Sequence, residues 1–131
     1  MAEATSRIRR LIADELGTCH DEDVEKRLTE IQALAESAFE NDSTRQVFAV
    51  LGNDTRYRLA RALAASGDEL CVCELEQLVD VSDSAVSHAL SDLVDAGIVH
   101  RRKEGNWRYY RTTELATSLF ETADRQGATN E

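Results

Sequence analysis

The cysteines are the side chains of this sequence whose type and spacing could do chemistry. Cys71 and Cys73 are separated by one residue, and Cys19 lies far upstream. Three thiols are an odd number, which argues against a disulfide framework and leaves metal binding, redox sensing or core packing. Two thiolates underfill a site for a soft ion, so Cys19 or another ligand is expected to complete it. For Cys19, plain packing in a core stays an equal alternative.

The spacing of Cys71 and Cys73 sets a condition on the backbone. Residues i and i+2 point about 200° apart on a regular helix, so both thiols can reach one ion only where a helix begins, frays or unwinds. A short helix is predicted over about 71–79, and Glu69 and Leu70 lie where it should start. Chelation there would pull on the first turn of this helix, which leads into the next predicted helix, at about 83–95.

Apolar residues at steps of three and four predict further helices over 22–39, 43–51, 54–65, 83–95 and 113–125. Gly52 is expected as a left-handed cap of the second of these, and Ser82 as the N-cap of helix 83–95. Residues 98–103 and 107–112 alternate with period two around a 104–106 turn, which predicts a β-hairpin. Two short helices, a tight turn and a hairpin make a winged helix-turn-helix, so the expected fold is mainly α with a small β-hairpin.

The helix 83–95 and the hairpin carry the candidate DNA contacts. Opposite the apolar stripe, the helix presents small hydroxyls and an imidazole that can approach base edges: Ser84, Ser87, His88 and Ser91. The hairpin offers cations for phosphate or the minor groove: Arg102, Lys103 and Arg108. A merely solvated face is the alternative. Acids on the same helix, at 83, 92 and 95, oppose DNA binding.

The overall charge also opposes nucleic acid at first sight. The chain has 131 residues, a formal net charge of −10 and a pI near 4.7. The acids are concentrated in residues 18–42 and 68–95, however, whereas 45–61 and 96–111 are basic. Lysine occurs only at 26 and 103. Such an acid-rich, lysine-poor surface suits concentrated salt, where self-repulsion is screened, although an ordinary acidic protein is the alternative.

Four stretches together resemble the ArsR/SmtB family of metal-sensing winged-helix repressors. They are residues 69–75 (ELCVCEL), 81–90 (VSDSAVSHAL), 93–99 (LVDAGIV) and 102–110 (RKEGNWRYY). The resemblance covers about residues 45–115. It implies a homodimer formed through the N- and C-terminal helices. It also implies repression of a resistance or efflux operon by binding double-stranded operator DNA without metal, and release on binding a toxic metal or metalloid.

By that resemblance Cys71 and Cys73 are metal ligands, and Ser84, Ser87 and His88 face DNA. The best-known arsenite sensors carry a third cysteine three positions after the second, and this sequence has Glu76 there. Residues 18–24 instead look like the N-terminal arm of the cadmium- and lead-sensing branch of the family. An arm cysteine is a ligand in that branch, so the resemblance implies Cys19 as the third thiolate. Three thiolates suit As(III), Sb(III) or Pb(II), and Cd(II) would ask for a fourth ligand, for which His20 and Glu76 are candidates. Residues 113–125 contain no histidine, so the family's other, C-terminal zinc site is expected to be absent.

These inferences divide the chain into an arm and dimerisation helix (1–41), a winged core (42–112) and a C-terminal helix and tail (113–131). No apolar run approaches a membrane span, and the first residues lack a secretory signal, so a cytoplasmic protein is expected. No catalytic constellation is visible, so an enzyme is not expected. Two alternatives stay open: a thiol-disulfide switch on the same fold, and a dimeric binding module with a structural metal and no operator.

Overall fold

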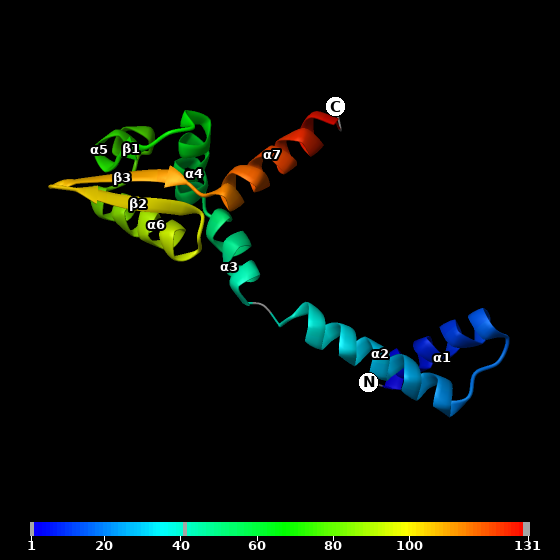
Figure 1. Cartoon of the computed structure of the whole chain (residues 1–131). Coiled ribbons are helices and arrows are strands. Elements are labelled where there is room, and N and C mark those ends of the chain that lie inside the picture. The colour runs from blue at the N-terminus through cyan, green and yellow to red at the C-terminus, as the bar shows by residue number, and fades with distance from the viewer. Residues whose placement is uncertain (1, 41, 130–131) are drawn as a thin grey trace. The chain divides into compact units, whose positions relative to one another are not determined.

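A computed structural model of the chain describes residues 2–40 and 42–129. The elements follow in the order α1 (Ala2–Leu16), α2 (Asp21–Ala38), α3 (Asp42–Leu51), α4 (Asp54–Ser66), β1 (Leu70–Cys71), α5 (Val72–Leu75), the 3-10 turn η1 (Glu76–Leu78), α6 (Asp83–Asp95), β2 (Val99–Glu104), β3 (Trp107–Thr112) and α7 (Glu114–Thr129) (Figure 1). They group into two compact units, residues 1–42 and 43–131. The finer division predicted at residue 112 stays a prediction. No helix in the described part of the chain is long and apolar enough to cross a membrane.

The first unit is a pair of helices, α1 and α2. Ile12 of α1 and Val24 of α2 are buried in it, and ion pairs from Arg9 to Asp21 and from Arg27 to Glu15 join the two helices. Helix α2 matches the predicted 22–39 helix, and its acidic first turn suits the positive end of the helix dipole. Helix α1 was not predicted from the sequence.

The second unit is the winged helix-turn-helix. The helix predicted over about 71–79 is divided into α5 and η1, and the tight turn at 79–82 separates η1 from α6. The Ser82 hydroxyl caps α6 by accepting the Ala85 N–H at 3.1 Å, as predicted. Strands β2 and β3 form the wing, whose turn uses Gly105 at φ 62°. The sheet has a third strand, in the order β1-β3-β2, where the sequence had predicted only a hairpin. The left-handed conformation predicted for Gly52 is wrong. Among the described glycines, positive φ occurs at 17, 67, 97 and 105.

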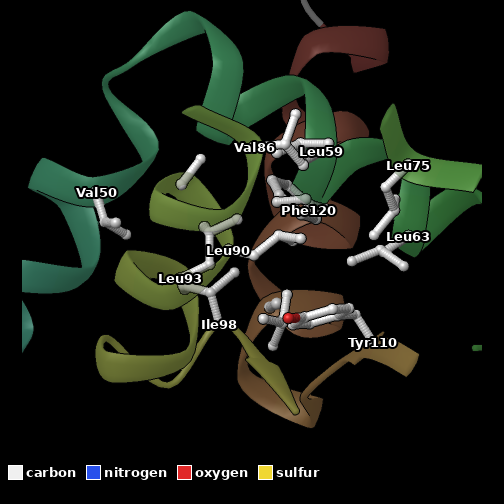
Figure 2. Packing of buried hydrophobic residues seen from close by; sticks show 14 residues of the cluster. Val50, Leu59, Leu63, Leu75, Val86, Leu90, Leu93, Ile98, Tyr110 and Phe120 are labelled. Carbon is white, nitrogen blue, oxygen red and sulfur yellow. The ribbon is translucent and has the colours of Figure 1, made fainter. Parts of the chain in front are cut away.

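The hydrophobic core lies where α4, α6, α7 and the sheet meet (Figure 2). Leu59 and Leu63 of α4 pack with Leu90 and Leu93 of α6, and all four are fully buried. Tyr110 of β3 is 2% exposed and also belongs to this core. This core fixes one face of α6 and the base of the wing, so the opposite face of α6 is turned to solvent.

Candidate metal centre and nucleic-acid interface

The two neighbouring thiols converge at the junction between a strand and a helix. Cys71 is the last residue of β1 and the N-cap of α5, and its backbone is extended (φ −72°, ψ 150°). Its N–H donates to Glu74 Oε1 at 2.8 Å, which holds the start of the helix. Because Cys71 lies outside the helix, the 200° relation does not apply, and the Sγ atoms of Cys71 and Cys73 lie 3.0 Å apart. The backbone condition set by the sequence is therefore met.

The two thiols differ in their surroundings. Cys71 is 6% exposed, whereas Cys73 is exposed, and both are free. The hydrogen bond to Cys71 raises the pKa of the Cys73 thiol, and desolvation and the Glu74 carboxylate raise it further. A pair of adjacent sulfur donors fits a soft metal or metalloid ion better than a hard one. Within residues 2–40 and 42–129, no three His, Cys, Asp or Glu side chains lie together as a complete metal site.

The predicted third ligand belongs to the other unit. Cys19 lies in the loop between α1 and α2, is partly buried, and its Sγ contacts the His20 carbonyl oxygen at 3.8 Å. His20 is exposed and is the N-cap of α2, and its N–H donates to Asp23 Oδ2 at 3.0 Å. A site shared by Cys19, Cys71 and Cys73 stays a prediction.

The predicted reading residues lie on the solvent side of α6. Ser84, Ser87 and His88 are exposed and Ser91 is partly buried, while the other face of the helix packs in the core. None of these four side chains makes a hydrogen bond or ion pair with another described residue. They are available to a ligand outside the chain.

The pleat of the wing sorts its cations onto two faces. Partners across an antiparallel pair share a face, and successive residues alternate. Lys103 pairs with Arg108, two positions from the buried Tyr110, so both point to the side of the sheet that faces α6. Arg102 pairs with Tyr109 and lies on the opposite side. The sequence grouped these three cations as one DNA-contacting set.

A hollow of about 310 Å³ joins the reading helix, the wing and the thiol-bearing segment. It is lined by Val72, Glu76, Ser87, Lys103, Asn106 and Arg108. Lys103 and Arg108 make no ion pair with any residue that the structure describes. Val72 stands between the two cysteines, so a shift of either thiol reaches a wall of this hollow. Glu76, a candidate extra ligand, also lines it.

Arg102 is engaged elsewhere. Its Nε donates to Glu69 Oε2 and its Nη1 to Glu104 Oε2, both at 2.8 Å, and its guanidinium lies 4.7 Å from the centre of the Tyr109 ring. The two carboxylates raise the pKa of the guanidinium. These contacts compete with the predicted phosphate contact. Glu69 was missed as a functional candidate, and the only signal in the sequence was its place just before Cys71.

Comparison with known proteins identifies the family. The family model described as "Bacterial regulatory protein, arsR family" matches residues 53–101. A Halobacterium salinarum protein named "Putative arsenical resistance operon repressor ArsR" is 49% identical over 121 residues, which cover 89% of this chain and 92% of the relative. A second protein of that organism, given the same name with ArsR2, is 58% identical over 79 residues, covering 60% of this chain and 66% of the relative.

The fold has close counterparts among solved structures. The homodimeric winged helix-turn-helix DNA-binding domain of Mb0332 from Mycobacterium bovis matches with a TM-score of 0.63 at 25% identity. The match covers 72% of this chain and 87% of that domain. The expected winged helix-turn-helix is thereby confirmed. Because this chain is 49% identical to the Halobacterium protein over nearly the full length of both, it belongs to the ArsR family of transcriptional regulators.

Proposed function

We propose that this protein represses a metal or metalloid resistance operon by binding operator DNA in its metal-free form and releasing it when a thiophilic ion binds Cys71 and Cys73. The observation that carries the proposal is the position of the thiol pair. The two sulfurs lie 3.0 Å apart in the segment whose Val72 lines one hollow with Ser87 and Arg108. The segment that binds the ion therefore also lines the hollow that is proposed to contact DNA.

The proposed DNA contacts follow from that hollow. The exposed hydroxyls and the imidazole of α6 read base edges in the major groove, with Ser84, Ser87, His88 and Ser91 as the reading set. Lys103 and Arg108 bind backbone phosphates beside the helix. Arg102 keeps its predicted phosphate contact only if it leaves Glu69 and Glu104.

Release follows from the geometry of the sulfurs. An ion held by both thiolates would lie between the two sulfurs. Cys71 and Cys73 would then exchange their 3.0 Å hydrogen bond for contacts with the ion. Cys71 is buried and paired with Tyr109 in the sheet, so the start of α5 has to adjust. Val72 moves with it, and the hollow that receives the DNA backbone changes shape.

The ion is proposed to be As(III) or Sb(III), with Cd(II) or Pb(II) as the alternative. Both Halobacterium relatives are named for arsenical resistance, and three thiolates suit a trivalent metalloid. Cys19 is proposed as the third thiolate, from the same or the partner protomer. The proposal predicts that Cys19→Ser weakens the thiolate charge-transfer absorption given by arsenite, and an unchanged spectrum would remove Cys19 from the site. No ion is proposed for DNA binding itself.

A homodimer is proposed through the N- and C-terminal helices. Within the first unit, Leu34 of α2 is 68% exposed and Phe39, the C-cap of α2, is 79% exposed. Within the second unit, Leu115 of α7 is 46% exposed. Apolar side chains this exposed favour burial against a second copy. The Mb0332 domain is described as homodimeric. Sedimentation at micromolar concentration tests the proposal, and a monomer would overturn it.

The acidic surface is proposed as an adaptation to a salt-rich cytoplasm. Two relatives come from Halobacterium salinarum, and the net charge of −10 is tolerable where salt screens self-repulsion. The protein is then expected to lose stability as salt is diluted, which a thermal melt at several salt concentrations measures. A melting temperature independent of salt would contradict this.

The contact between the sulfurs also favours a second candidate function, a thiol-disulfide switch. Atoms 3.0 Å apart need little movement to form a bond under a two-electron oxidant such as peroxide. The separating experiment is operator binding followed by fluorescence anisotropy, with arsenite added while the thiols are kept reduced. Release under these conditions supports ion sensing, whereas release by peroxide but not by arsenite supports the switch.

A further inference from the structure

The ion pair between Glu69 and Arg102 joins the thiol-bearing segment to the wing. Glu69 immediately precedes β1, and Arg102 is on β2, the strand at the other edge of the sheet. Their side chains meet at 2.8 Å across the intervening β3, with the guanidinium 4.7 Å from the centre of the Tyr109 ring. Tyr109 is also the ladder partner of Cys71. One thiol, Tyr109 and the ion pair therefore occupy the same face of the sheet.

The Glu69–Arg102 ion pair, here called the tie, links the segment before β1 to β2 across that face. Strand β1 has two residues, so its ladder to β3 is short. Glu69, the residue before β1, is held to β2 by this ion pair. A movement of the wing is therefore expected to carry β1 with it more fully than the two-residue ladder alone would. The Arg102 guanidinium also pairs with Glu104 at the turn end of β2, so one side chain connects Glu69 to the turn end of the wing. By contrast, Lys103 and Arg108 have no carboxylate partner in the described chain.

We propose that Arg102 is a positioning residue, which with Glu69 ties the wing to the thiol-bearing segment and sets the wing's orientation toward DNA. The inference rests on the proposed function and adds a second route to it. Val72 transmits movement on the inner side of the sheet, and the Glu69–Arg102 tie transmits it on the outer side. Lys103 and Arg108 bind phosphate, whereas Arg102 holds the strand that carries one of them.

The test uses the full-length protein with Glu69→Gln, Arg102→Gln, the double variant and two controls. Arg108→Gln removes a cation without a carboxylate partner, and Glu114→Gln removes an acid for which the structure shows no ion pair. Trp107, the single tryptophan, is 56% exposed and pairs with Glu104 in the wing, so its fluorescence quenching reports the wing without any metal.

Glu69→Gln and Arg102→Gln are expected to change Trp107 quenching alike, and the double variant no further, while Glu114→Gln leaves it unchanged. With arsenite, each tie variant is expected to reduce the loss of operator affinity by about two- to fivefold relative to wild type, the scale of one exposed ion pair. Arg108→Gln lowers the salt slope of operator binding by about one, and Arg102→Gln by clearly less.

Two results would overturn the tie: an Arg102→Gln salt slope as low as that of Arg108→Gln, or Trp107 quenching that Glu69→Gln does not change. Failure of the proposed function shows differently. Wild-type protein would then keep its operator in arsenite, while the metal-free Trp107 measurements would still decide whether Glu69 and Arg102 position the wing.

Discussion

Replacing the exposed thiol, Cys73→Ser, should separate ion sensing from folding and from DNA binding. Cys73 is exposed, so serine there is expected to change the free energy of unfolding by less than about 0.5 kcal/mol. Cys71 is 6% exposed, and Cys71→Ser buries a hydroxyl at a cost of about 1–3 kcal/mol. Cys73→Ser is therefore the cleaner variant, and Cys71→Ser is the supporting one.

The expected magnitude comes from the coupling between the two sites. Coupling of about 1–3 kcal/mol corresponds to a loss of operator affinity of about 5- to 150-fold when the ion binds. Without the Cys73 thiolate, an ion can no longer replace the 3.0 Å hydrogen bond between the two side chains, and the start of α5 stays in place. Arsenite should then shift the operator affinity of Cys73→Ser by less than about twofold.

The assay is fluorescence anisotropy of a labelled duplex from the gene's own promoter, with and without arsenite, under reducing conditions. Unfolding in urea checks that each variant is folded, and the metal-free operator affinity checks that the DNA surface is intact. A Cys73→Ser protein that binds its operator and is released by arsenite as strongly as wild type would refute the reasoning.

Three further predictions concern DNA binding, stability and pH. Arg108→Gln should weaken operator binding at every sequence tested and lower the salt slope by about one, because Arg108 lines the hollow without a carboxylate partner; an unchanged slope would place it off the DNA. Leu90→Ala should lower the free energy of unfolding by about 2–5 kcal/mol in urea titrations, because Leu90 is fully buried; a loss below 1 kcal/mol would mean a core that collapses around the gap. A thiol must lose its proton to bind Cd(II), and the raised pKa of Cys73 keeps this thiol protonated near pH 7. Cd(II) affinity should therefore keep rising with pH from about 7 to beyond 9, and a flat profile would argue against a thiolate ligand.

Most of the second unit could be predicted from the sequence because its signals are local. The Ser82 cap, the turn at Gly105 and the apolar stripe of α6 each depend on neighbouring residues. The alternation of the hairpin places Tyr110 on the core side of the sheet. The sequence set the condition that a helix must begin near Cys71 and Cys73 for the thiols to meet, and placed that start at Glu69 and Leu70. The helix begins instead at Val72, after the short strand β1.

What the sequence did not predict depends on contacts between distant residues. Strand β1 exists because Leu70 and Cys71 pair with Tyr110 and Tyr109, and no two-residue window can show this. The capture of Arg102 by Glu69 likewise joins residues 33 positions apart. Treating the wing cations as one set overlooked the pleat, which places Arg102 on a different face from its neighbours in sequence.

The most direct test of the central claim follows ion binding and DNA release in the same sample. Operator-bound protein is titrated with arsenite, while thiolate charge-transfer absorption and the anisotropy of the labelled DNA are recorded together. We expect both signals to reach their end point at the same ratio of arsenic to protomer, and both to be lost in Cys73→Ser. Saturated absorption with the operator still bound would contradict the claim that Cys71 and Cys73 control release.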